Sequence, residues 1–271
     1  VGRRHSLHRR RPPEPSLRAV LTEVALQALA ALAAVLPLGA ETHLRVLESP
    51  LRIEGASQDR EALGRLVAAL AMLVVGRRAW LHALGRARRK ESIATAFGLV
   101  IGLIGAEAWR RLSESVRPSP VAIGAGLVLT SLMLATLRVA PDDRRGAAKT
   151  RAAVIIAIVL SLSGLPGGSA VASAMVALSW SGRRASVESV LALAAPLELV
   201  AAGSVALRAR TGTFTGDVAS LIAGAAAAAL VAAIAIRWLR SSPRAVTTLC
   251  QRWLLVLGLA ELALAWALGV G

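Results

Sequence analysis

Long apolar segments alternate with short clusters of arginine along most of the chain, and this alternation restricts its fold more than any other feature. The apolar segments lie at roughly 19–36, 66–76, 93–109, 121–137, 152–182, 187–207, 218–236 and 253–271. Because a helix needs about 20 apolar residues to cross a bilayer, most of these segments predict spanning or nearly spanning helices. The 66–76 segment is short, and it spans only if Arg65, Arg77 and Arg78 extend to the interface beside Trp80.

The composition excludes an ordinary soluble domain. Hydrophobic residues make up 55% of the 271 residues, charged residues only 18%, and the mean hydropathy is +0.61. The net charge of +16 comes from basic clusters between apolar runs rather than on one face. This distribution is typical of the positive-inside rule of membrane proteins, so we expect a membrane and no nucleic acid as the partner. The pattern predicts an all-α, polytopic helix bundle in a membrane.

We expect two regions, a tail over 1–18 and a single transmembrane domain over 19–271. Residues 1–16, VGRRHSLHRRRPPEPS, are basic and proline-rich, which is typical of a disordered tail attracted to anionic lipid headgroups. The apolar run that follows shows no small-residue cleavage site, so we do not expect a signal peptide.

Two apolar segments are interrupted by residues that disfavour helices. Residues 34–39 read AVLPLG, and residues 163–169 read SGLPGGS. Backbone broken in this way survives in a bilayer only where protein or water satisfies its polar groups. Broken segments in corresponding halves of a chain point to a site near the midplane of an inverted-repeat protein. We therefore expect the two breaks to meet and form a pocket for an anionic headgroup; two ordinary proline kinks are the alternative.

The charges between segments predict the topology. The stretches 77–90, 138–151 and 237–252 are all rich in arginine, so all three should lie on the cytoplasmic side. This requires 152–182 to enter and leave on one side as a re-entrant hairpin. We expect about six spanning helices and two broken or re-entrant segments. The charge pattern leaves open whether the first break re-enters, and with it the side of the N-terminus.

Residues 162–203 resemble the second signature of the undecaprenyl-diphosphate phosphatase family, in which a Pro-Gly-x-Ser-Arg-Ser-Gly turn precedes a glycine-rich helix, a basic residue and an apolar helix with a proline. The matching residues are Pro166, Gly167, Ser169, Arg183, Glu188 and Pro196. Residues 36–44, LPLGAETHL, resemble the end of the first signature, where a Glu-x-x-x-Glu helix runs into Phe-Leu-Pro-x-Ser-Ser-x-Gly-His-Leu.

The resemblance implies a multi-pass protein of the bacterial inner membrane that hydrolyses undecaprenyl diphosphate and regenerates the lipid carrier of cell-wall synthesis. It implies His43 as general base or nucleophile, Ser169 as the second catalytic residue, and a divalent cation, Mg²⁺ or Ca²⁺, as cofactor. It also places the substrate at Gly167, Gly168, Ser169 and Arg183.

The chain departs from the family at the charged positions. Aligned on the signatures, the two glutamates of the family fall on Ala30 and Ala34, and its arginine falls on Ala170. Loss of one preorganised donor typically costs about 3 kcal/mol of transition-state stabilisation. Losing both carboxylates and the arginine should nearly abolish turnover unless other residues replace them.

Several polar residues are candidates for replacement, each with a plainer alternative. Glu41 could orient His43 or bind the metal. Glu198 lies in an apolar helix, where a carboxylate marks a substrate site or pairs with an arginine of a neighbouring helix. Ser169 suits a phosphate at a helix start, or simply caps that helix. Glu23 and Gln27 share one helix face and are expected to lie at the interface or to cap a polar face.

Three functions follow from these observations. The first is hydrolysis of undecaprenyl diphosphate. The second is a non-catalytic relative that binds, moves or senses a polyprenyl phosphate lipid. The third is an unrelated transporter of a small solute or a structural membrane partner, which broken helices also permit.

Overall fold

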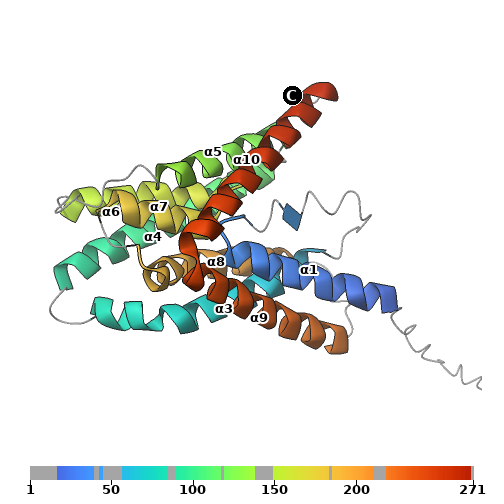
Figure 1. Cartoon of the computed structure of the whole chain (residues 1–271), viewed down its shortest axis with the longest axis horizontal. Helices are drawn as coiled ribbons and strands as arrows, with labels where there is room; N and C mark the ends of the chain where they lie inside the picture. Colours follow the sequence, from blue (N-terminus) through green and yellow to red (C-terminus); the bar gives the residue numbers. More distant parts are fainter. Residues whose placement is uncertain are drawn as a thin grey trace, which may run out of the picture.

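The computed structural model describes residues 17–39, 43–44, 57–84, 89–116, 119–137, 149–182, 185–209 and 218–269. The basic tail over 1–16 and two predicted site residues, Glu41 and Arg183, lie outside these ranges. Every regular element among the described residues is a helix (Figure 1), which confirms the all-α prediction.

Each predicted apolar segment overlaps one or more helices, although α3 (Ser57–Leu84) and α10 (Pro243–Ala267) begin well before the segments 66–76 and 253–271. Their bounds are α1 Leu17–Val35, α3 Ser57–Leu84, α4 Arg89–Val116, α5 Pro120–Thr136, α6 Lys149–Ser161, the 3₁₀ turn η2 Leu162–Gly164, α7 Ala170–Trp180, α8 Val187–Ala209, α9 Val218–Ser241 and α10 Pro243–Ala267. Proline at the first position of α5 and of α10 suits a helix start, because the ring presets φ and the missing N–H would have no helical partner.

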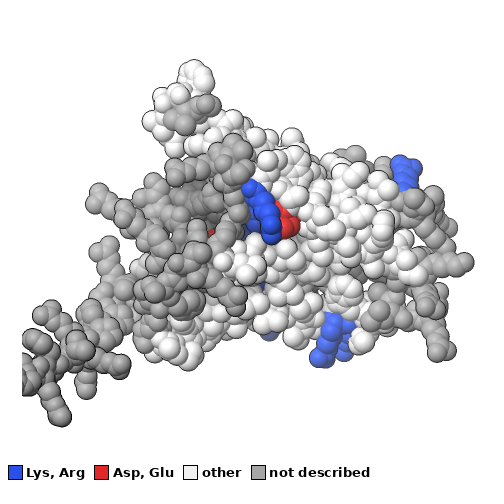
Figure 2. Space-filling model, turned by 180° about the vertical axis from the view of Figure 1, so that it is seen from behind, with Lys and Arg blue, Asp and Glu red and all other residues white. Residues whose placement is uncertain are grey.

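Within the described residues, four helices are long and apolar enough to cross a bilayer: Ile93–Ser113 of α4, Val187–Ser204 of α8, all of α9 and all of α10. Large apolar side chains such as Ile222, Leu230 and Val256 lie exposed on these helices. On the face in Figure 2, most of the described surface is neither basic nor acidic. A surface of this kind suits lipid as its solvent, and the chain is a helical membrane protein.

Small residues allow the helices to pack closely. A Cβ added to Gly76 of α3 would lie 2.9 Å from the Cα atom of Ala192 of α8, and one added to Gly98 of α4 would lie 2.7 Å from the carbonyl oxygen of Ala153 of α6. Such close approach is the usual basis of helix association in membranes, where lipid tails are as apolar as the side chains. Figure 1 shows the same side-by-side packing for α1 with α9 and for α5 with α10.

The 152–182 segment folds as a helix–break–helix hairpin. Helix α6 has 13 residues and α7 has 11, so each is about 16–20 Å long, roughly half of the hydrocarbon core. The two helices pack against each other, which means that the chain turns back between them. The predicted interruption at 163–169 is thereby confirmed.

The two breaks lie in direct contact. Gly39 and Gly167 both adopt left-handed backbone, with φ of 75° and 78°. A Cβ added to Gly39 would lie 2.6 Å from the carbonyl oxygen of Gly168. Thr130 of α5 donates its hydroxyl proton to the carbonyl of Gly167 at 3.1 Å and so satisfies one backbone acceptor freed by the break. The prediction that the breaks meet is confirmed.

We predict that Gly39→Ala lowers the free energy of unfolding by about 2 kcal/mol, because alanine strains left-handed backbone and its methyl group would overlap Gly168. Thermal unfolding in detergent measures the effect. Gly203→Ala in α8 is the matched control, since its Cβ would meet nothing within 4 Å, and it should be neutral or slightly stabilising. Equal stability of the two variants would contradict the contact between the breaks.

Candidate functional site

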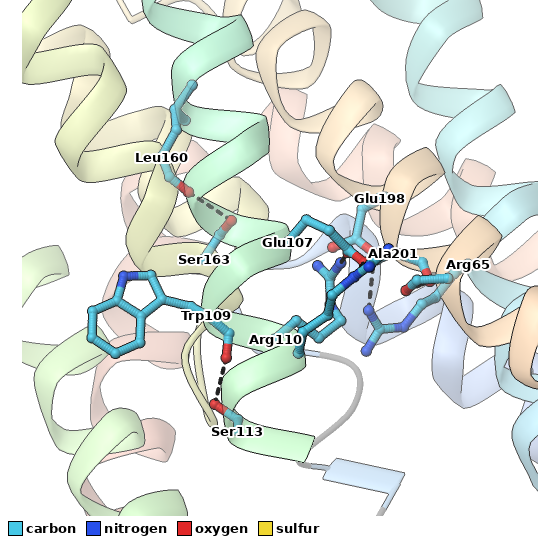
Figure 3. A network of polar contacts seen from close by, with 11 residues as sticks. Arg65, Glu107, Trp109, Arg110, Ser113, Leu160, Ser163, Glu198 and Ala201 are labelled. Carbon is cyan, nitrogen blue, oxygen red and sulfur yellow. Dashed lines mark hydrogen bonds and ion pairs between the residues drawn. The ribbon is translucent and has the colours of Figure 1, made fainter. Parts of the chain in front are cut away.

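A small cavity of about 20 Å³ lies between the second break and helices α3, α4 and α8. Arg65 of α3, Arg110 of α4 and Glu198 of α8 line it, together with Gly167 and Gly168 of the break. Charged side chains from three helices therefore converge where the backbone of the hairpin turns. Figure 3 shows Arg65, Arg110 and Glu198 at this place, with Glu107 among them.

Arg65 is buried, with 5% of its surface exposed. Its guanidinium lies 2.7 Å from Glu61 one turn earlier in α3 and 3.7 Å from Glu198. The expectation that Arg65 extends to the interface is therefore wrong, whereas Arg77 and Arg78 are exposed. The reason is that Arg65 faces α8, and its buried charge is compensated by Glu61 of its own helix and by Glu198 of α8.

Arg110 is the second buried cation, and its guanidinium lies 2.6 Å from Glu107. The same carboxylate accepts a hydrogen bond from Arg111 at 2.8 Å, but the Arg111 side chain is 75% exposed against 8% for Arg110. Two adjacent arginines thus share one partner, and only Arg110 reaches the cavity. A guanidinium keeps its charge when buried and can bind two phosphate oxygens at once.

His43 lies at the first break, and both of its ring nitrogens are engaged. The carbonyl of Gly39 lies 2.9 Å from Nδ1. The indole N–H of Trp253 in α10 donates to Nε2 at 2.9 Å. Since Nε2 accepts and the carbonyl can only accept, Nδ1 carries the proton and the imidazole is neutral. His43 does not line the cavity. Its two hydrogen-bonding contacts instead connect the first break, at Gly39, with Trp253 of α10.

Ser169 caps helix α7. Its hydroxyl accepts the backbone N–H of Ala172 at 3.3 Å, and 2% of the residue is exposed. The residues on either side, Gly168 and Ala170, line the cavity. The positive end of the α7 dipole consequently points toward the cavity.

The structure brings three of the residues predicted to bind substrate, Gly167, Gly168 and Glu198, to one cavity. Glu198 pairs with Arg65 of a neighbouring helix, which was one of its two predicted roles, and it also lines the cavity. The sequence did not predict Arg110 as a residue of the site, because it directly follows the apolar segment 93–109 and resembles the charged end of a spanning helix. Glu107 inside that segment, three residues before an arginine, was the available signal.

The positions that carry the glutamates of the family are closed by packing. Ala30 and Ala34 are 0% and 1% exposed. A Cβ added to Gly64 of α3 would lie 2.8 Å from the methyl carbon of Ala30. Ala170, at the position of the family's arginine, lines the cavity that Arg65 and Arg110 also reach.

A second polar pair lies between α1 and α9. Ser220 donates its hydroxyl proton to Glu23 at 2.8 Å, and Gln27 packs against Gly224. Glu23 is 5% exposed and Gln27 is 0% exposed, so the prediction that they lie at the interface is wrong. The reason is that their shared face of α1 turns toward α9 rather than toward lipid headgroups.

The described residues do not fit a divalent cation. They contain no group of three His, Cys, Asp or Glu side chains able to hold one. Glu198, which lines the cavity, and Glu61 both contact Arg65, and Glu107 contacts Arg110. A divalent cation placed among these carboxylates would also face both arginines, which repel it. Glu41 lies outside the described residues.

The sequence matches no protein-family model and no curated protein.

We predict that diethyl pyrocarbonate acylates His43 more slowly than the exposed His82 of α3, because neither ring nitrogen of His43 is free. Trp253→Phe removes the donor to Nε2 and should raise the rate at His43 while leaving His82 unchanged. Mass spectrometry of the modified peptides measures both rates. Equal rates in the unaltered protein would show that the imidazole is accessible and reactive.

Proposed function

We propose that this membrane protein binds the phosphate headgroup of a polyprenyl phosphate lipid without hydrolysing it. The observation that carries the proposal is the convergence of two buried arginines, Arg65 and Arg110, on a cavity at the start of helix α7. Buried cations inside a membrane protein mark substrate paths. A helix N-terminus beside two guanidinium groups suits a phosphate rather than a neutral solute.

The polyprenyl chain is proposed from the resemblance to undecaprenyl-diphosphate phosphatase signatures. The resemblance also points to the bacterial inner membrane as the location. Contact between the two Pro-Gly breaks supports it, because both signatures then contribute to one region of the protein. A phosphate held at this depth leaves its hydrocarbon chain in the apolar surroundings of the bundle.

Three features support binding over hydrolysis. Both nitrogens of His43 have partners, so the imidazole is not available as a base or nucleophile. Ala30 and Ala34 are packed into the core, which leaves no space for carboxylates at those positions. The hydroxyl of Ser169 caps α7. Phosphoryl transfer needs an oriented nucleophile as well as charge, and only the charge is in place.

We also propose that the bundle is an inverted repeat in which α1, α3, α4 and α5 correspond to α6, α8, α9 and α10. Helix α1 packs on α9, and α6 packs on α4. If α1 corresponds to α6 and α9 to α4, each of these two contacts is the counterpart of the other. The pairs α3 with α8 and α5 with α10 map onto themselves. The similar left-handed glycines at the two breaks, Gly39 and Gly167, support the same pairing.

In this arrangement α3, α4, α5, α8, α9 and α10 are the six spans, and α6 with α7 is a re-entrant hairpin. The basic stretches 77–90, 138–151 and 237–252 then lie on one side of the membrane, as the positive-inside rule requires. A simple crossing at 152–182 would separate them.

The test is calorimetry on the full chain in phosphatidylcholine nanodiscs with farnesyl phosphate, a polyprenyl phosphate short enough to handle in solution. We predict that Arg110→Gln weakens binding about 10- to 100-fold, because a charge-assisted pair of hydrogen bonds to phosphate is lost. Arg111→Gln is the matched control. This substitution neutralises the other arginine that pairs with Glu107, one that does not line the cavity. It should leave the affinity nearly unchanged.

Each other outcome decides against part of the proposal. Equal loss in both arginine variants would move the site away from the cavity. Binding of inorganic phosphate or phosphatidylglycerol as tight as that of farnesyl phosphate would overturn the polyprenyl assignment. Release of phosphate from undecaprenyl diphosphate, with or without Mg²⁺ or Ca²⁺, would establish the hydrolase instead.

A further inference from the structure

We propose that Thr130 of α5 makes the cavity selective for an anion, because its hydroxyl holds the carbonyl oxygen of Gly167 outside the cavity. The proposal rests on the proposed function and adds to it a residue that does not touch the phosphate. Thr130 does not line the cavity, whereas Gly167 does. It is therefore a positioning residue that acts through the backbone of the second break.

The first argument is the partner that the hydroxyl of Thr130 has. A serine or threonine within a helix commonly donates its hydroxyl proton to a carbonyl of its own helix, about one turn earlier. Thr136 of α5 and Thr247 of α10 do so, each at 2.7 Å. Thr130 instead donates to Gly167, 37 residues along the chain, and only 5% of Thr130 is exposed. The hydroxyl thus serves the break and not its own helix.

The second argument is the direction of the carbonyl groups at the break. A Cβ added to Gly126 of α5 would overlap the carbonyl oxygen of Pro166. The next oxygen, that of Gly167, receives the hydroxyl of Thr130, and the one after it faces Gly39 of the first break. Neither α5 nor Gly39 contributes to the lining of the cavity. Three consecutive carbonyl oxygens therefore face neighbouring segments that lie outside the cavity.

The third argument is the effect that an inward carbonyl would have on a phosphate. A carbonyl oxygen is the negative end of the peptide dipole, so it repels an anion at close range. A buried carbonyl also requires a donor. The cavity, which Gly167 already lines, offers one in the guanidinium of Arg110. Without the hydroxyl of Thr130, the Gly167 oxygen would turn toward that donor and compete with the phosphate for it.

The expected loss of affinity follows from the same exchange. In a protein without this hydroxyl, a phosphate can bind only after the Gly167 oxygen has turned outward again. The oxygen then lies buried without a donor, and that cost is subtracted from the free energy of binding. A group that only held α5 in place would lower the stability of the protein without this specific penalty.

The neighbouring Ser131 is the matched control. It is 1% exposed, and its hydroxyl donates to the carbonyl of Gln251 in α10 at 2.8 Å. Both hydroxyls therefore tie α5 to a backbone acceptor of another segment. Only the acceptor of Thr130 lines the cavity, so only Thr130 should affect the binding of an anion.

The experiment measures the affinity of the full chain for farnesyl phosphate by calorimetry in phosphatidylcholine nanodiscs, and thermal unfolding in detergent. Thr130→Val removes one hydroxyl at nearly constant shape, and Ser131→Ala removes the other. Both substitutions should lower the unfolding temperature. We predict that Thr130→Val also weakens binding about tenfold, the cost of one unsatisfied buried carbonyl. Ser131→Ala should leave the affinity nearly unchanged, and Thr130→Ser, which restores the donor, should recover it.

If Thr130→Val does not fold, Thr130→Cys takes its place. Its thiol is a weak donor, and the cysteine side chain differs from that of serine by a single atom. Thr130→Cys should therefore bind farnesyl phosphate more weakly than Thr130→Ser does.

The failures are distinguishable. No binding of farnesyl phosphate by the unaltered protein would overturn the proposed function. Binding by the unaltered protein, together with equal affinities of Thr130→Val and Ser131→Ala, would overturn the role of Thr130 and leave the proposed function intact. A Thr130→Ser variant that binds as weakly as Thr130→Val would overturn that role as well, since the restored donor would then have no effect.

Discussion

A helix that breaks inside hydrocarbon must satisfy its released backbone groups within the protein, and this constraint governs the architecture. The carbonyl of Gly167 receives the hydroxyl of Thr130, and Gly39 packs directly on Gly168. Each break therefore supports the other, and both are enclosed by helices. The same enclosure places the start of α7 beside α3, α4 and α8, which creates the cavity.

Charge in the cavity obeys a similar rule. A buried arginine is tolerated only with partners, and Arg65 and Arg110 have theirs in Glu61, Glu198 and Glu107. These pairs keep the empty protein stable, but they also occupy the groups that an anion would use.

Close packing of α1 and the charge of the cavity account for the alanines at positions 30, 34 and 170. At the first two positions the small side chain lets α1 pack closely, as the contact of Ala30 with Gly64 illustrates. At the third, the cavity receives its positive charge from Arg65 and Arg110 instead.

Local properties of the sequence determined the helices, the two breaks and the membrane setting. Hydropathy, proline and glycine act over a few residues, so the segments 93–109, 121–137 and 163–169 could be predicted directly. Tertiary structure alone decided which side chains meet. Arg65 was expected at the interface, and Glu23 with Gln27 likewise, yet all are buried because the rotation of α3 and α1 about their axes depends on the partners α8 and α9. Arg110 reaches the cavity and Arg111 does not, although they are neighbours, because one residue turns a helix by about 100°.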